Sequence, residues 1–214
     1  MSRAYIIMGE SGSGKTTAMR TLNPDETYYI DCDGKGLSWK GWREQYNAEK
    51  KNYIKTDDQD KVLKLMDGID KKCENIHNVV IDTLNSIMVA DERRRLKEKT
   101  YDKWADLAWS VYDICIKASQ LRDDLNVIVL AHTQTEVDEN TGERFTRILT
   151  NGKKLNKIGL EKYFTTVLLT KATENGFVFE TRANKSTAKT PMGAFPDNEI
   201  PNDIQAVLDT LKDY

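Results

Sequence analysis

The sequence is poor in cysteine, histidine and proline, and these shortages narrow the possible functions. Of its 214 residues, only 3 are Cys, 2 are His and 4 are Pro. Cys32, Cys73 and Cys115 stand far apart and form no C-x-x-C pair, which indicates reduced thiols and predicts a cytoplasmic protein. Because His77 and His132 are the only histidines, a His-rich metal site is excluded.

Long apolar runs and an excess of charge are also missing. No segment approaches the length of a membrane span, and strand-like residues begin so soon after Met1 that no signal peptide is expected. The net charge is −2 although 31% of residues are charged, so the overall charge does not point to nucleic acid. A hydrophobic content of 39% is enough for a full core, and we expect residues 1–214 to form one domain.

The charge is nevertheless distributed unevenly along the chain. The segment from Arg144 to Lys189, called the basic segment below, contains ten Lys or Arg residues and three Glu residues, a net charge of +7. The rest of the chain is therefore acidic. Such a local concentration of cations favours an anionic ligand, although runs of charge are often simply solvated.

One motif is present in full. An apolar run, Ala4–Met8, is followed by the pattern G-x-x-x-x-G-K-[ST], with a helix expected directly after it. This is the context that a phosphate-binding loop requires. We expect Lys15 to neutralise the β- and γ-phosphates of ATP and the Thr16 hydroxyl to ligate Mg²⁺. The residues predicted to surround the nucleotide are Gly9, Ser11, Gly12, Ser13, Gly14, Lys15, Thr16 and Thr17.

A second carboxylate is needed beside such a loop to hold the Mg²⁺ shell. The stretch Val79–Thr83 is an apolar strand that ends in Asp82. An apolar strand ending in Asp is common by itself, but together with the phosphate loop it predicts Asp82 as the second metal-site residue.

Hydrolysis also needs a group that orients or deprotonates the attacking water. Asp31 and Asp33 follow a predicted strand, and we choose Asp33 for this role, with a turn residue before Gly34 as the alternative. Polar residues also follow the apolar strand Asn126–Ala131. Since ligands bind at the carboxyl ends of parallel strands, we expect at least one of His132, Thr133 and Gln134 to sense the nucleotide state, with capping of the strand end as the alternative.

The pattern of segments predicts an α/β fold with a mostly parallel sheet flanked by helices. Asn175-Gly176 lies between two apolar runs and predicts a β-hairpin near the C-terminus. We expect one long helical region over residues 87–123 and a polar loop over residues 135–157. The last helix has an apolar face of Ile204, Val207, Leu208 and Leu211.

The order of these motifs resembles the RecA-type P-loop NTPase core. The whole chain is similar to compact phage-encoded AAA/RecA-like proteins, the core-only recombinases linked to single-strand annealing. The stretches that carry this resemblance are Ile30–Asp33, His132–Gln134, Asn151–Lys154, Phe195-Pro196 and Ile200–Asp203. Asp33 matches the family's catalytic glutamate, shortened by one methylene, and Gln134 or His132 matches its nucleotide-sensing residue. Unlike larger RecA-like proteins, this sequence predicts no separate N-terminal DNA-binding or polymerisation domain.

The resemblance implies partners as well as a fold. It implies a homo-oligomer with ATP between subunits, in the cytoplasm of a bacterial host, where a cation of one subunit reaches the γ-phosphate of the next; the candidates are Arg182, Lys185 and Lys189. It also implies that residues 135–157 bind single-stranded DNA. The candidates there are Arg144, Phe145, Arg147, Lys153, Lys154 and Lys157.

Two alternatives remain open at this point. The loop also fits G-x-x-G-x-G-K-T, a spacing frequent in small-molecule kinases, and Asp91–Arg95 faintly resembles an acceptor-binding motif of nucleotide kinases. A kinase is expected to have an Arg-rich lid, whereas the polar loop contains only two Arg residues. The third interpretation is a nucleotide-gated assembly factor.

Overall fold

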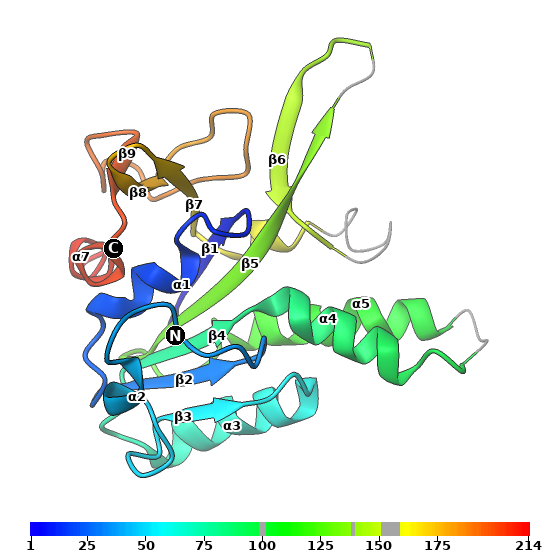
Figure 1. Ribbon diagram of the computed structural model, residues 1–214, viewed down its shortest axis with the longest axis vertical. Helices are drawn as coiled ribbons and strands as arrows, with labels where there is room; N and C mark the ends of the chain where they lie inside the picture. The colour runs from blue at the N-terminus through cyan, green and yellow to red at the C-terminus, as the bar shows by residue number, and fades with distance from the viewer. Residues whose placement is uncertain (99–101, 138–139, 151–158) are drawn as a thin grey trace.

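The computed structural model describes residues 1–98, 102–137, 140–150 and 159–214. Its centre is a sheet with the strand order β3-β2-β4-β5-β1-β7-β8-β9, and β6 pairs with β5 (Figure 1). The pairs from β3 to β7 are parallel, and β6, β8 and β9 run antiparallel to their neighbours. The predicted mostly parallel α/β fold is confirmed.

The strands are β1 (Arg3–Gly9), β2 (Thr27–Asp31), β3 (Tyr53–Lys55), β4 (Asn78–Asp82), β5 (Asn126–Val137), β6 (Arg144–Ile148), β7 (Thr166–Thr173), β8 (Gly176–Glu180) and β9 (Glu199–Pro201). The α-helices are α1 (Lys15–Ala18), α2 (Trp42–Gln45), α3 (Gln59–Lys72), α4 (Leu84–Arg94), α5 (Asp102–Lys117) and α7 (Ile204–Thr210). Two 3₁₀ turns complete the described elements, Met19–Thr21 and Leu160–Tyr163.

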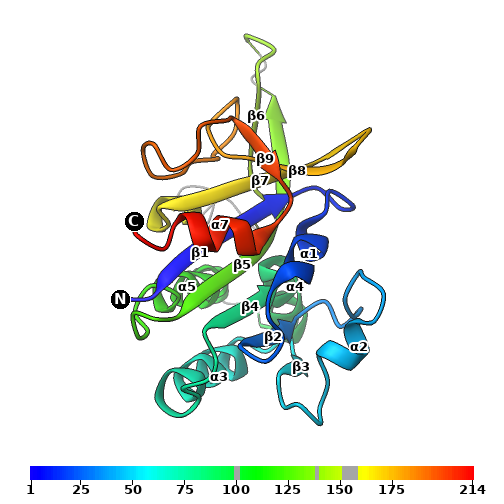
Figure 2. The ribbon, with the colours of Figure 1, turned by 90° about the vertical axis from the view of Figure 1, so that its left-hand side faces the viewer.

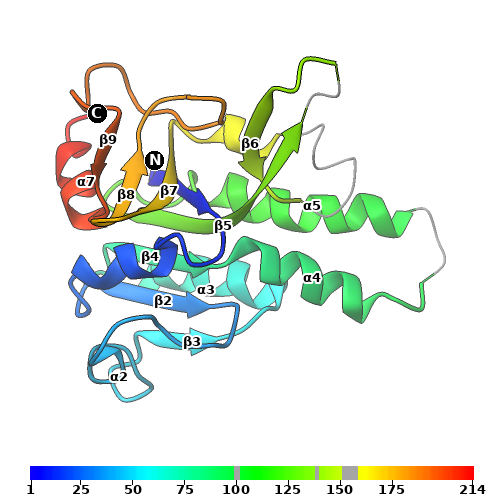
Figure 3. The ribbon, with the colours of Figure 1, turned by 45° about the horizontal axis from the view of Figure 1, so that its top comes forward.

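The parallel strands are buried on both faces, which explains why they are continuous apolar runs. In β1, Ile6 and Met8 face one side and belong to the core with α3, α4 and α5. Tyr5 and Ile7 face the other side and belong to the core with α1 and α7. In Figure 3 the long helices α4 and α5 lie together on one side of the sheet, and α7 lies apart from them, beside β9.

The position of β5 decides how the site is assembled. It lies between β1 and β4, so the phosphate-loop strand and the Asp82 strand are not direct neighbours. Gly9 is in register with His132, and Asp31 is in register with Asp82. The carboxyl ends of these four strands therefore meet at one edge of the sheet.

The segment predicted as a polar loop over residues 135–157 contains strand residues in its described part. β5 continues to Val137 and forms an antiparallel hairpin with β6, from Thr133 opposite Ile148 to Val137 opposite Arg144. The prediction failed because most side chains of these two strand segments are polar and lie outside the core, so the sequence shows no apolar alternation there. In Figure 1 this hairpin extends well beyond the body of the sheet.

One helix prediction also needs correction. The predicted region 87–123 contains two described helices, α4 and α5, which pack against each other rather than forming one helix. The predicted helix after the phosphate loop is present: Lys15–Ala18 is α-helical and continues as a 3₁₀ turn to Thr21.

The predictions near the C-terminus are confirmed. Thr166–Thr173 and Gly176–Glu180 form the antiparallel hairpin that Asn175-Gly176 predicted. The apolar face of α7 is buried, with Ile204 and Val207 fully covered. The short strand β9, which pairs with β8, was not predicted.

Candidate functional site

The phosphate loop joins β1 to α1 and is shaped by its glycines. Gly12 and Gly14 have φ values of 79° and 99°, in the left-handed region that residues with a Cβ rarely adopt. These turns allow successive backbone N–H groups to point toward one anion at the start of α1. The Ser13 hydroxyl is 2.5 Å from the Thr170 hydroxyl of β7, which fixes the loop to the sheet.

The Lys15 ammonium group is folded back onto its own loop. It donates to the carbonyl oxygens of Gly9, at 2.9 Å, and Glu10, at 2.8 Å, and it lies 3.3 Å from Nδ1 of His132. Burial lowers the pKa of Lys15 to about 8, although the Asp82 carboxylate acts in the opposite direction. The amine is therefore held in the loop without a direct carboxylate partner among the described residues.

Asp82 and Thr16 lie in direct contact, as their predicted metal role requires. The Thr16 hydroxyl donates to Oδ2 of Asp82 at 2.8 Å, and the Tyr29 hydroxyl donates to the same oxygen at 2.6 Å. Asp82 is 1% exposed, and its Oδ1 is buried without a hydrogen-bond partner in the described part of the chain. Burial raises the pKa of this carboxyl group, against the effect of its two hydrogen bonds.

This donor set fits Mg²⁺. A buried carboxylate oxygen without a partner is costly unless a cation or donor satisfies it, and Mg²⁺ prefers oxygen ligands. No group of three or more His, Cys, Asp or Glu side chains suited to a metal occurs among the described residues. A Mg²⁺ ion at this position would be bound by one carboxylate, one hydroxyl and the phosphates of a nucleotide.

The two aspartates after β2 have different surroundings. Asp31 accepts hydrogen bonds from the backbone N–H groups of Gly34 and Gly36, at 2.8 and 2.9 Å, and from the Tyr53 hydroxyl at 2.6 Å. Both of its oxygens therefore hold the turn. Asp33 lies beside the site instead, and its carboxylate contacts the side chains of Lys35, Thr83 and Ser86.

Asp33 accepts from the hydroxyl groups of Thr83, at 2.9 Å, and Ser86, and forms an ion pair with Lys35. Burial favours the neutral acid, but the bonds from Lys35, Ser86 and Thr83 outweigh it and lower the pKa of Asp33. The carboxylate is thus ionised at neutral pH and is fixed in orientation. This arrangement suits the positioning of a water molecule better than strong proton abstraction.

His132 links the loop to the β5–β6 hairpin. Its backbone N–H donates to Oδ1 of Asn85 at 2.6 Å, its carbonyl accepts from Leu149 N at 2.7 Å, and its ring faces Lys15. Burial and the nearby ammonium group lower the pKa of His132, so the ring is neutral. His132 thus lies where it can register a movement of Lys15.

Gln134 lies two residues farther along the extended β5, opposite Arg147. Its side-chain amide donates to Glu136 at 2.9 Å. The structure therefore places it in the hairpin. The sensing role of Gln134 stays a prediction.

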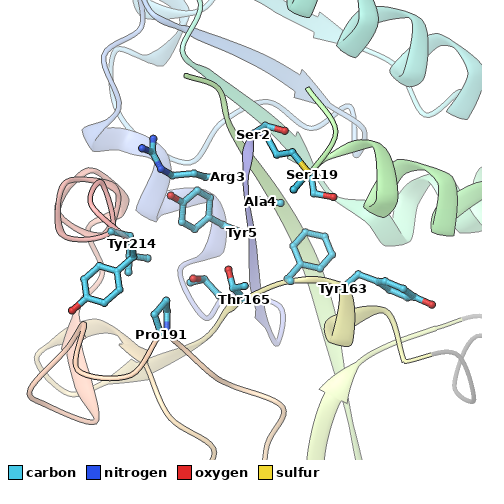
Figure 4. Close-up of a pocket in the computed structure, with 13 residues that line it drawn as sticks. Ser2, Arg3, Ala4, Tyr5, Ser119, Tyr163, Thr165, Pro191 and Tyr214 are labelled. Carbon is cyan, nitrogen blue, oxygen red and sulfur yellow. The ribbon is translucent and has the colours of Figure 1, made fainter. Parts of the chain in front are cut away.

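A cavity of about 690 Å³ opens beside Asp33. Its polar wall includes Asp33, Asn85 and His132, and its outer wall includes Arg93 and Arg94 from the end of α4. A second cavity, of about 490 Å³, lies at the opposite end of β1 around Tyr5, Tyr163 and Tyr214 (Figure 4). None of the predicted site residues lines that second cavity.

The three cations predicted to reach a neighbouring subunit differ in exposure and in the hydrogen bonds that they make. Arg182 donates to the Phe195 carbonyl at 2.8 Å and to Asn198 at 3.2 Å, so it holds its own loop. Lys185 is exposed, and no bond of its ammonium group is found within the described residues. The backbone of Lys189 pairs with Val167. Lys185 is therefore the most accessible of the three.

The candidate DNA-binding residues fall into three groups. Arg147 forms a two-pronged ion pair with Glu136, at 3.0 and 2.9 Å. Arg144 and Phe145 are exposed on β6. The β6 strand also adjoins the Lys185 loop, because Thr146 N donates to the Lys185 carbonyl at 2.8 Å. Lys153, Lys154 and Lys157 lie outside the described residues.

Several site residues were not predicted from the sequence. They are Tyr29, which contacts Asp82, Lys35 and Ser86, which hold Asp33, and Asn85, which holds His132. Tyr29 carried a usable signal, since it lies two residues before Asp31 on a buried strand and so shares a face with it. The others lie in a loop and on α4, where only the fold brings them to the carboxylates.

The comparisons with known proteins agree with this geometry. The profile of a family described as "AAA domain" matches residues 1–192. A search of curated proteins found no significant match. None of the helices in the described part of the chain is long and apolar enough to cross a membrane.

Proposed function

This chain belongs to the AAA domain family, and on that premise we propose that it is a Mg²⁺-dependent ATPase that acts on single-stranded DNA. The observation that carries the ATPase proposal is the contact of Thr16 with Asp82, whose second oxygen is buried and unpartnered. A phosphate loop beside such a carboxylate is suited to a metal-bound triphosphate.

Each site residue then has a defined task. Lys15 turns from the Gly9 and Glu10 carbonyls to the phosphates, and Thr16 and Asp82 hold the cation. When bound, Mg²⁺ supplies neutralisation of the phosphate charge. Asp33 orients the attacking water, held in place by Lys35, Ser86 and Thr83. When Lys15 turns to the phosphates it leaves His132, so nucleotide binding changes a contact between the loop and the β5–β6 hairpin.

The DNA proposal rests on the basic segment. Its β6 strand and its Lys185 loop lie side by side, which collects Arg144, Phe145 and Lys185 in one part of the molecule. Exposed cations bind backbone phosphates without regard to sequence, and an exposed aromatic ring stacks on any base. Together with the resemblance to compact phage AAA/RecA-like proteins, this supports a role in recombination or annealing.

We also propose a homo-oligomer with the nucleotide at the subunit interface, where Lys185 or Lys189 reaches the neighbour's γ-phosphate. Mixing Lys15→Ala subunits with Lys185→Ala/Lys189→Ala subunits tests this. The mixture is expected to recover part of the ATPase activity, since one kind of shared site is intact. A mixture that co-assembles and stays inactive contradicts the interface.

A small-molecule kinase is the second candidate. The observation that favours it is the cavity beside Asp33, where Arg93 and Arg94 lie on the outer wall and can receive an anionic acceptor. Arg94 is already paired with Asp57, which reduces the charge available to such an acceptor. We therefore place this function behind the ATPase.

One experiment separates these functions. ATP hydrolysis is measured with and without single-stranded DNA, beside size-exclusion chromatography with ATP. Stimulation by DNA and ATP-dependent assembly support the proposal. Assembly with ATP but no response to DNA leaves a nucleotide-gated assembly factor. Negligible hydrolysis, together with phosphate transfer to an added nucleoside monophosphate, favours the kinase.

A further inference from the structure

An exposed aromatic ring lies directly on the phosphate loop. Phe177, the second residue of β8, is 37% exposed. A Cβ placed on Gly14 would come within 2.5 Å of the Phe177 Cγ, so the ring covers the loop at the start of α1. In Figure 2 the β7–β8 hairpin overhangs the turn between β1 and α1.

The exposure of Phe177 is not explained by the core. Side chains alternate along a strand, so Phe177 shares a face with Phe179. Phe179 is fully buried in the core that includes Ala18 of α1 and Val207 of α7. Phe177 lies beyond this cover, at the edge where β1 ends. Its ring therefore presents an apolar surface to solvent beside an anion-binding loop.

The strand order gives this ring a specific place relative to ATP. The metal-site residue Asp82 is on β4, and Asp33 follows β2, on one side of β1 in the sheet. β8 lies on the other side of β1, beyond β7. If a nucleotide binds in an extended form with its γ-phosphate at Asp82 and Asp33, its ribose and base would lie on the opposite side of the loop, the side of β7 and β8. That direction leads to Phe177.

We propose that Phe177 is the base-stacking residue of the nucleotide site. This inference rests on the proposed ATP binding and deepens it, because it assigns the site's contact with the nucleobase. Stacking uses the π face that every base has, so this contact is tolerant of base identity. ATP and GTP are both expected to depend on it.

The test compares two ligands on matched variants. Phe177→Leu keeps apolar bulk against Gly14 but removes the ring, and Phe177→Trp keeps a ring. The control, Tyr214→Ala, removes another exposed aromatic residue, one that lines the cavity at the opposite end of β1. The dissociation constants of Mg-ATP and of magnesium tripolyphosphate, which has no base, are measured by calorimetry for each protein.

Phe177→Leu is expected to weaken ATP by about 5- to 150-fold while tripolyphosphate binding stays unchanged. Phe177→Trp and Tyr214→Ala are expected to bind both ligands like the unmodified protein. Equal weakening of both ligands by Phe177→Leu would mean that the ring only supports the loop, and unchanged ATP binding would mean that the base lies elsewhere; either result overturns the inference. An unmodified protein that binds neither ligand would refute the proposed function itself.

Discussion

The phosphate loop and the basic segment hold their charged groups in opposite ways. At the loop, Lys15 is held by carbonyl oxygens, and Asp82 keeps one oxygen unpartnered within the described structure. In the basic segment, Arg147 and Lys171 are already paired with carboxylates. The loop therefore has charge ready for a ligand, whereas at least two of the ten cations of the basic segment already have carboxylate partners within the protein.

This difference shows that a count of charged residues in the sequence overstates the cations that a ligand can meet. Lys171 contacts both Glu180 and Glu199, and Arg182 contacts backbone carbonyls. Glu199 lies outside the basic segment, so the sequence count could not include it. Ion pairs at a surface contribute little to stability, but they lower the number of unpaired cations available to a polyanion such as DNA. Arg144 and Lys185 remain as the accessible candidates.

The strongest test of this difference between the loop and the basic segment is to remove the Lys15 cation. Lys15→Ala is expected to weaken ATP binding by about 100-fold, because the phosphates lose a charged hydrogen-bond donor. Calorimetry with Mg-ATP measures this, and circular dichroism checks that the fold is kept. Unchanged affinity would show that Lys15 does not meet the phosphates.

The two aspartates after β2 provide the next test. Asp33→Asn is expected to bind ATP normally and to hydrolyse it about ten-fold more slowly or worse, within the range for a lost general base or water-orienting group. Asp31→Asn is expected to lower the melting temperature, since the Asp31 oxygens accept three hydrogen bonds that hold the turn. If Asp31→Asn alone slows turnover without loss of stability, the assignment of Asp33 is wrong.

The pH dependence of binding tests the state of Lys15. Its pKa of about 8 in the free protein is depressed, so the amine becomes neutral as the pH rises through 8. Bound phosphate favours the charged amine, so ATP binding takes up a proton above that pH. The affinity is expected to be roughly ten-fold weaker at pH 9 than at pH 7.

Calorimetry in buffers of different ionisation enthalpy measures that proton uptake directly. Lys15→Arg is the control, because a guanidinium group stays charged throughout this range and the pH dependence should vanish. A flat profile for the unmodified protein would show that Lys15 is charged in the free loop at pH 9.

The sequence predicted the residues at strand ends and missed those brought there by the fold. Asp82 and Lys15 could be predicted because the chemistry of a phosphate loop fixes their local spacing. Lys35 and Ser86, which hold Asp33, carry no local pattern and reach it only through a loop and a helix. The extended part of β5 was missed because no core covers it, and hydrophobic alternation reports burial rather than strand geometry.

The smallest expected effect distinguishes two arginines of one strand. Arg144 and Arg147 both lie on β6, but only Arg147 is paired with Glu136 across the hairpin. If single-stranded DNA binds here, Arg144→Ala should flatten the log–log dependence of affinity on salt by about 0.7, the value for one phosphate contact. Arg147→Ala should change the slope less, because its charge is already neutralised.

Glu136→Gln sharpens the test, because it releases Arg147 from its partner and should therefore steepen the dependence of affinity on salt. Equal effects of the two Ala variants would mean that DNA displaces Glu136, and no effect of either would place the DNA away from β6.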